Sequence, residues 1–307
     1  MTNRSLFALL TLSLAAGVAG CSEDAGSATS ADEIKSQPRR DVVSRMALPL
    51  LEVSGLAARD GRFVAVGDRS SDIVSFGLDP AGEAVDVVVH RTGVATGKSG
   101  SQWEAIALDG AGNAAVLSET GELFVFGKDL ERPSATVKID YPSVNALIDG
   151  HVEQNSLGEG LVLLEGGHIL VAIEKSPSVL VEMGPAGSAP AGYAPGREVH
   201  GRFAPGATTF VALAAWQVKD DGSTPDLSDL TVGPTGALFA LSQQGRAFVR
   251  LEATLRPDER SAHVKEVFPI DKQLTFAEGL VFRGPSPVVG RDRDHDAKNV
   301  YVLSPIP

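Results

Sequence analysis

Residues 158–184 read GEGLVLLEGGHILVAIEKSPSVLVEMG and represent the unit from which the chain is built. It contains three short apolar runs, LVLL, ILVAI and VLVEM, which are separated by EGGH and EKSPS. Paired glycines and a Ser-Pro pair are typical of tight turns, and apolar runs of this length are typical of buried strands. The stretch therefore predicts a meander of three β-strands.

The same pattern occurs four more times in the chain. The other repeats are VSGLAARDGRFVAVGDRSSDIVSFG from residue 53, WEAIALDGAGNAAVLSETGELFVFG from residue 103, LSDLTVGPTGALFALSQQGRAFVRL from residue 227 and AEGLVFRGPSPVVGRDRDHDAKNVYVL from residue 277. Equivalent positions, separated by 50, 55, 69 and 50 residues, are Ser54, Glu104, Glu159, Ser228 and Glu278. A period of about 40 to 50 residues with several strands in each repeat is typical of β-propellers. We therefore predict an all-β chain that folds as a β-propeller, with five four-stranded blades favoured over six.

Each blade also needs an outer, fourth strand. Apolar segments suit this place at residues 84–91, 135–141 and 263–270, with a less distinct one near residues 199–203. The last repeat has no such segment, whereas residues 41–50 have a strand pattern before the first repeat. We therefore expect the N-terminal strand to complete the last blade, so that the ring closes without exposed inner edges.

The sequence leaves two details of the repeats open. Residues 210–216, FVALAAW, lie in the longest interval between repeats and indicate either a surface insertion or part of a sixth blade. In the last repeat, residues 288–291 and 299–303 form the second and third strands, or residues 299–303 form the second strand and the third is missing.

The N-terminus has the pattern of an export signal. Arg4 precedes an apolar run at residues 6–16, and the sequence VAGC at residues 18–21 resembles the lipobox of bacterial lipoproteins. This resemblance implies cleavage before Cys21, the only cysteine in the chain, and attachment of lipid to it. The segment that follows is rich in small and polar residues, which is typical of a flexible tether.

These features divide the chain into three parts. We predict a lipoprotein signal peptide over residues 1–20, the lipidated Cys21 and a tether over residues 21–40, and the propeller over residues 41–307. Ser22 after the cysteine favours the outer membrane if the host is Gram-negative. The net charge of −12 argues against nucleic acid as a partner, and we expect a monomer held to the membrane by its lipid anchor.

Carboxylates recur at positions that a propeller would bring together. The inner strands of all blades surround one axis, so Glu104, Glu159 and Glu278 are expected to meet at one end of the channel, with Ser54 and Ser228 in the same ring. The ends of the second strands would add further polar groups near this ring: Asp68, Glu119, Glu174, Gln243 and Asp292. Carboxylates placed together repel one another unless a cation or a basic side chain neutralises them.

These groups predict a site for a hard cation. Oxygen ligands without His or Cys suit Ca²⁺ or Mg²⁺ better than zinc. We expect Ca²⁺ to be bound by Glu104, Glu159, Glu278, Asp68, Glu119 and Glu174. The alternative is that these acids pair with Lys175, Arg69 and Arg291.

The repeats also carry motifs of a known family. Ser54-Gly55-Leu56, Glu159-Gly160-Leu161 and Glu278-Gly279-Leu280 begin the inner strands, and IEKSP occurs at residues 173–177. With these motifs the chain resembles the SdiA-regulated family of bacterial β-propellers and, more distantly, propellers with esterase-like phytase activity. The resemblance covers residues 51–303 and implies the fold more strongly than an activity. Ala105 and Asp229 replace the glycine in two repeats.

Two functions follow from these observations. The first is a binding or interaction module that holds a cation and an unknown small-molecule or protein ligand at one face of the channel. The alternative is a metal-dependent phosphoesterase, in which the cation polarises a phosphoryl oxygen and activates water. Phosphate binding usually also requires converging Arg or Lys side chains, which are scarce near these turns. A lactonase-like hydrolase is disfavoured because the chain lacks a matching metal triad.

Overall fold

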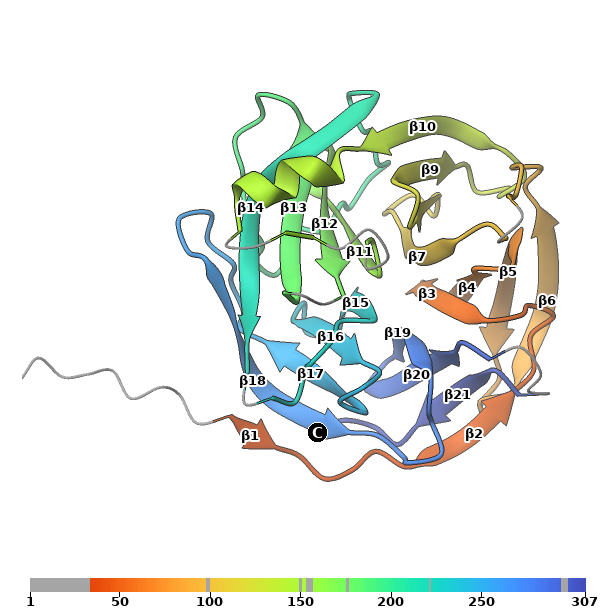
Figure 1. Cartoon of the computed structure of the whole chain (residues 1–307). Helices are drawn as coiled ribbons and strands as arrows, with labels where there is room; N and C mark the ends of the chain where they lie inside the picture. The colour runs from red at the N-terminus through yellow and green to blue at the C-terminus, as the bar shows by residue number, and fades with distance from the viewer. Residues whose placement is uncertain are drawn as a thin grey trace, which may run out of the picture. The chain divides into compact units, whose positions relative to one another are not determined.

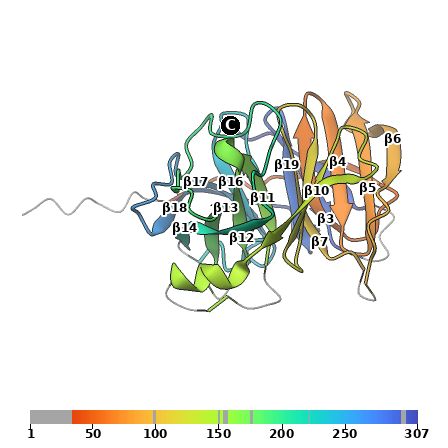
Figure 2. The ribbon, with the colours of Figure 1, turned by 90° about the horizontal axis from the view of Figure 1, so that it is seen from above.

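The computed structural model describes residues 34–97, 100–148, 151–152, 157–174, 177–220, 222–293 and 298–307. The predicted signal peptide, Cys21 and the first part of the tether lie outside these residues. Within the compact unit Ile34–Pro307, β-strands are arranged as a ring (Figure 1), and they run roughly along the ring axis when the unit is seen from the side (Figure 2). Among the described residues, no helix has the length and apolar character needed to span a membrane.

Neighbouring strands pair antiparallel in consecutive sets of four, and each set runs from the channel outward. The first set is β3 (Val53–Arg59), β4 (Arg62–Gly67), β5 (Ser70–Leu78) and β6 (Ala84–Arg91). The next is β7 (Trp103–Leu108), β8 (Ala114–Ser118), β9 (Glu122–Phe126) and β10 (Pro133–Ile139). It is followed by β11 (Gly160–Leu164), β12 (His168–Ile173), β13 (Val179–Pro185) and β14 (Thr209–Lys219).

The C-terminal part of the chain continues the pattern. One set is β15 (Asp229–Val232), β16 (Leu238–Ser242), β17 (Ala247–Leu251) and β18 (Ser261–Pro269). In the final set, β19 (Ala277–Arg283), β20 (Ser286–Arg291) and β21 (Val300–Leu303) are joined by the N-terminal strand β2 (Val42–Met46). The expected pairing of the N-terminal strand with the last repeat is therefore observed.

Asn299 holds the two ends of the chain together. Its side chain is buried, accepts a hydrogen bond from the Leu48 backbone N–H at 2.8 Å and donates to the carbonyl oxygens of Leu48 and Leu50 at 3.1 and 2.6 Å. The Asn299 backbone N–H also donates to the Met46 carbonyl at 3.0 Å. A buried amide with these partners fixes the register of the closing strand, because a slip would leave polar groups unpaired.

The structure corrects the expected fourth strand of the third set and decides between the two alternatives for the last repeat. The fourth strand of the third set is not near residues 199–203, because β14 occupies that place and contains residues 210–216. That apolar run pairs with β13 and is therefore not a surface insertion. In the last repeat, β20 and β21 are the second and third strands, as in the first of the two alternatives.

The structured unit also begins earlier than residue 41. Strand β1 (Lys35–Ser36) pairs in parallel with β18, and the backbone N–H of Arg40 donates to the Pro269 carbonyl at 2.7 Å. The last residues of the expected tether therefore lie against the outer edge of the fourth set. Outer strands are also joined to one another, since β14 pairs in parallel with both β10 and β18.

The inner strands contact one another in the order β3, β7, β11, β15, β19 and back to β3. Glycines permit this close approach. A Cβ atom on Gly160 would lie 2.3 Å from the Leu230 backbone nitrogen, and one on Gly55 would lie 3.0 Å from the Ala105 Cα atom. The glycine of the repeated Glu/Ser-Gly-Leu motif is thus explained by packing between neighbouring inner strands.

Asp229 takes the glycine position in one repeat. Its carboxylate is buried and accepts hydrogen bonds from the backbone N–H groups of Leu230 at 2.7 Å and Leu280 at 2.5 Å. Burial raises the pKa of this carboxyl group, and the two hydrogen bonds oppose that shift. In this repeat the side chain itself links β15 to β19.

Candidate functional site

The predicted carboxylates Glu104, Glu159 and Glu278 lie where their inner strands begin, at one end of the channel. Glu104 and Glu278 are the second residues of β7 and β19, and Glu159 immediately precedes β11. Each of the three is close enough to the other acidic groups for their charges to affect its pKa. The acids that take part in these interactions include all six predicted ligands, together with Asp292: Glu104, Glu159, Glu278, Asp68, Glu119 and Glu174.

Burial and mutual repulsion disfavour the charged forms of these acids. Burial, followed by the charges of Asp68 and Glu119, raises the pKa of Glu104 to about 8. Burial and the neighbouring carboxyl groups also raise the pKa values of Glu159 and Glu278 well above the ordinary value. A cation among these groups would lower all three pKa values, because it favours the carboxylate form.

Some members of the cluster have polar partners. The Gln243 side-chain amide donates to Glu278 Oε1 at 3.0 Å, and the Gln102 amide donates to Glu119 Oε2 at 3.2 Å. Arg69 forms ion pairs with Glu52 and, at 3.6 Å, with Asp68. The expectation that Arg69 neutralises acids is therefore partly met, while Lys175 lies outside the described residues.

Among the residues that the structure describes, no three His, Cys, Asp or Glu side chains are arranged closely enough to hold a metal ion by themselves. The oxygen-rich composition nevertheless suits a hard cation. Calcium takes six to eight oxygen ligands and commonly includes water among them. A cation at this end of the channel would therefore need water or a bound molecule to complete its coordination.

Tyr141 supplies a further polar group that faces the cluster. It begins the short 3₁₀ helix η1 (Tyr141–Ala146), and its side chain is 5% exposed. Its hydroxyl has no hydrogen-bond partner within the described parts of the chain. Burial and the charges of Glu159 and Glu119 raise its pKa. The hydroxyl is therefore close to the acids without being hydrogen-bonded to them.

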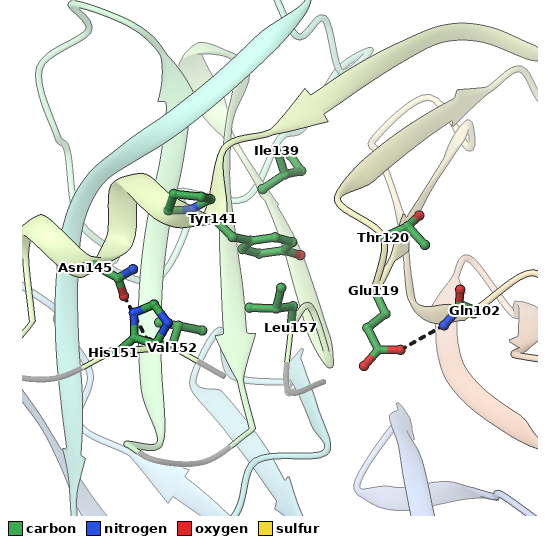
Figure 3. A pocket seen from close by; sticks show the side chains of 10 residues that line it. Gln102, Glu119, Thr120, Ile139, Tyr141, Asn145, His151, Val152 and Leu157 are labelled. Atoms are coloured by element: carbon green, nitrogen blue, oxygen red, sulfur yellow. Dashed lines mark hydrogen bonds between the residues drawn. The ribbon is translucent and has the colours of Figure 1, made fainter. Parts of the chain in front are cut away.

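A cavity of about 410 Å³ lies beside this hydroxyl. Figure 3 shows the Tyr141 ring between Ile139 and Leu157, with its hydroxyl directed toward the side of the cavity where Glu119 and Gln102 lie. The remaining lining residues are Thr120, Pro142, Asn145, His151 and Val152. The cavity has the size and the mixed apolar and polar lining that are typical of small-molecule sites.

The opposite end of the inner strands has a different lining. A second cavity, of about 360 Å³, is lined mostly by apolar residues of the inner strands, although polar atoms make up more of its surface than apolar atoms do. Arg59, Glu198 and His200 are the charged or titratable groups around it. Because Glu198 accepts a hydrogen bond from Tyr193, its carboxylate has a partner.

The sequence predicted the acids but not the cavity. Gln102, Tyr141 and Asn145 were not identified, because they lie outside the repeated motif. The interval between Glu104 and Glu159 is 55 residues instead of 50, and this extra length was the one sign of an additional element. Asp292, Asp294 and Asp296 alternate as in a calcium loop, but Ala297 and Leu303 stand where an EF-hand requires Gly and Glu. Asp294 and Asp296 lie outside the described residues.

Comparison with known proteins supports the fold class. No protein-family model and no curated protein sequence matches the chain. A glutaminyl cyclase from Myxococcus xanthus has 14% sequence identity and a TM-score of 0.51, over 88% of this chain and 100% of that one. A PQQ-bound aldose sugar dehydrogenase from Streptomyces coelicolor has 12% identity and a TM-score of 0.46, over 86% and 97%.

A virginiamycin B lyase from Staphylococcus aureus has 10% identity and a TM-score of 0.45, over 83% of this chain and 95% of that one. These neighbours are β-propeller-like, and at such low identity the likeness to the glutaminyl cyclase concerns the fold alone. Together with the cyclic contacts of the inner strands, it defines this chain as a β-propeller. No comparison supports the resemblance to the SdiA-regulated family.

Proposed function

We propose that this chain is a five-bladed β-propeller that serves as a binding module and holds a divalent cation, Ca²⁺, at the acidic end of its channel. The observation that carries the proposal is that Glu104, Glu159 and Glu278, at the starts of three inner strands, are buried and close enough to raise one another's pKa values. A bound cation removes the repulsion that this arrangement creates.

Five blades are supported by the strand pairing. Each set of four strands has one inner strand, and these inner strands contact one another in a closed order. The closing strand β2 leaves no inner strand without a neighbour on either side.

We also propose that the protein acts at the cell envelope, held there by lipid on Cys21. This proposal rests on the lipobox-like sequence at residues 18–21 and on the polar segment that follows it. Fractionation of cells that express the wild-type chain or Cys21→Ser tests it. We expect the wild-type chain in the membrane fraction and the variant in the soluble fraction. Membrane association of both would contradict lipid anchoring at Cys21.

Binding is preferred over phosphoester hydrolysis because of the charge at the site. The grouped side chains are carboxyls, whereas phosphate binding usually requires converging Arg or Lys side chains, and Arg69 is already paired with Glu52 and Asp68. The structure offers the hydrolytic alternative no specific support.

Thermal unfolding tests the cation site. The exported, unlipidated Cys21→Ser protein is treated with EDTA and then unfolded with and without Ca²⁺, Mg²⁺ or Zn²⁺. A ligand that binds only the folded state raises the Tm, so we expect calcium to stabilise the protein. The triple variant Glu104→Gln, Glu159→Gln and Glu278→Gln should lose this response, whereas Glu131→Gln, which alters an exposed acid, should keep it. An unchanged calcium response in the triple variant would exclude the ring.

A further inference from the structure

The cavity beside the acid cluster has an apolar side and an acidic side. Ile139, Val152 and Leu157 are each at most 9% exposed and contribute apolar surface to it, together with the ring of Tyr141. Glu119 and Gln102 lie across from the tyrosine ring (Figure 3). A ligand that fills the cavity would therefore meet apolar surface on one side and a carboxylate on the other.

The Tyr141 ring forms part of this apolar side, while its hydroxyl lies behind the cavity wall. The hydroxyl oxygen is buried from solvent and has no hydrogen-bond partner among the described residues. Gly158 leaves space for it, since a Cβ atom at that position would lie 2.5 Å from the hydroxyl oxygen. A small molecule in the cavity would therefore contact the ring and not the hydroxyl.

The polar side of the cavity selects a hydrogen-bond donor. Gln102 uses its amide N–H to donate to one Glu119 oxygen, and a carboxylate can accept further hydrogen bonds. The Glu119 carboxylate also lies close to the charge of Glu174, so this side of the cavity attracts positive charge. On the opposite wall, Asn145 Oδ1 accepts from the Val152 backbone N–H at 2.9 Å.

We propose that this cavity binds a small organic ammonium compound, whose cationic group contacts Glu119 and whose apolar group packs against Ile139, Val152 and Leu157. The ammonium N–H donates to the Glu119 carboxylate. Charge-assisted hydrogen bonds of this kind are stronger than neutral ones. This inference goes beyond the calcium site proposed at Glu104, Glu159 and Glu278, and it shares only Glu119 with the predicted ligand set.

Three probes with the same branched apolar group but different polar groups test the proposal: isopentylamine, isopentyl alcohol and isovalerate. Their binding to the exported Cys21→Ser protein is measured by calorimetry at pH 7, in EDTA and at constant ionic strength. We expect isopentylamine, which is cationic at this pH, to bind at least about tenfold more tightly than the neutral alcohol, and isovalerate to bind more weakly than both.

Substitutions locate the binding. Glu119→Gln keeps the side-chain shape and removes the charge, so it should weaken isopentylamine binding about tenfold and leave alcohol binding unchanged. Tyr141→Phe removes a hydroxyl that lies behind the cavity wall and should leave amine binding unchanged, so it serves as a control within the same wall. Glu131→Gln, at an exposed site, should change neither affinity.

Two results would overturn the inference. One is equal binding of the amine, the alcohol and the acid by the Cys21→Ser protein, and the other is unchanged amine affinity in Glu119→Gln. If calcium stabilises the protein while the amine has no advantage, this inference fails and the proposed cation site remains supported. If the amine binds through Glu119 while calcium has no effect, this inference is supported and the proposed cation site fails.

Discussion

The two ends of the channel are built from the same inner strands, yet their linings differ. Where the strands begin, Glu104, Glu159 and Glu278 are close enough for their charges to affect one another, and their pKa values are raised. Further along the same strands most of the lining residues are apolar, among them Leu56, Ile106, Leu161, Leu230 and Val281. Ser54 and Ser228 take the acidic position in the other two inner strands, so the fold does not require a carboxylate there. Because their pKa values are raised, ionisation of these acids is costly in the folded chain, so we expect them to destabilise the metal-free fold at pH 8 and attribute their presence to ligand binding.

The largest effect is expected at the apolar end. Leu56 is 3% exposed and packs in a cluster with Met46, Val53 and Val281. Leu56→Ala should lower the free energy of unfolding by about 2 to 5 kcal/mol, because it leaves a cavity in a packed core. Leu56→Met, which conserves volume, should cost less than about 1.5 kcal/mol. Urea titration measures both, and similar losses for the two variants would show that the site is not tightly packed.

At the acidic end, a substitution should have the opposite sign. In the metal-free protein at pH 8, Glu104→Gln should raise the free energy of unfolding by on the order of 1 kcal/mol. A shift of one pKa unit corresponds to about 1.4 kcal/mol in the free energy of unfolding, and screening by solvent reduces the free energy expected from the whole shift of Glu104. Glu131→Gln provides the control at an exposed acid. If Glu104→Gln destabilises the metal-free protein, the carboxylate has a stabilising partner and the comparison between the two ends fails.

The acidic end should also make stability depend on pH. Glu104 has an ordinary pKa of 4.5 and a folded-state pKa of about 8, so the folded chain retains a proton that the unfolded chain loses. Its stabilising contribution is fully present below pH 4.5 and is lost as the pH rises toward 8. In EDTA, the Tm should therefore fall by a few degrees more from pH 5 to pH 8 in the parent than in the triple Gln variant. If the Tm of the parent and that of the triple variant changed equally with pH, the raised pKa values would be contradicted.

The smallest effect is expected at an exposed charge near the apolar end. Asp60 is almost fully exposed and lies 3.9 Å from Arg59. Asp60→Asn should change the free energy of unfolding by less than about 0.5 kcal/mol, because exposed ion pairs contribute little. The calcium response should also be unchanged. Loss of that response on this substitution would mean that the cation site is not confined to the acidic end.

Much of the fold could be predicted because it repeats. The inner strands share the Glu/Ser-Gly-Leu pattern, and the glycine is required where neighbouring backbones approach closely, as at Gly160. Strand β14 was misplaced because a long loop separates it from β13. The position of that loop depends on Glu182, which is buried, contacts His168 at 2.7 Å and accepts hydrogen bonds from the Ala191 and Gly192 backbone N–H groups. These contacts of Glu182 are not part of the repeated pattern, so the repeat does not predict them.

The acids of the site could be predicted for the same reason, since equivalent positions in a ring converge. Tyr141 could not, because it lies in η1 after an outer strand and outside the repeat. Its place at the cavity depends on packing against residues such as Leu117 and Leu157, which also belong to its core cluster. The predicted calcium and lipid attachment at Cys21 stay predictions.

Calorimetric titration of the metal-free Cys21→Ser protein with Ca²⁺ tests the central claim most directly. At pH 7, in two buffers with different enthalpies of ionisation, calcium should bind and release protons, because Glu104 with a pKa of about 8 is largely protonated beforehand. The triple Gln variant should show neither binding nor proton release, while Glu131→Gln should behave like the parent. Absence of calcium binding, or equal binding by the triple variant, would contradict the assignment of the acidic end as a cation site.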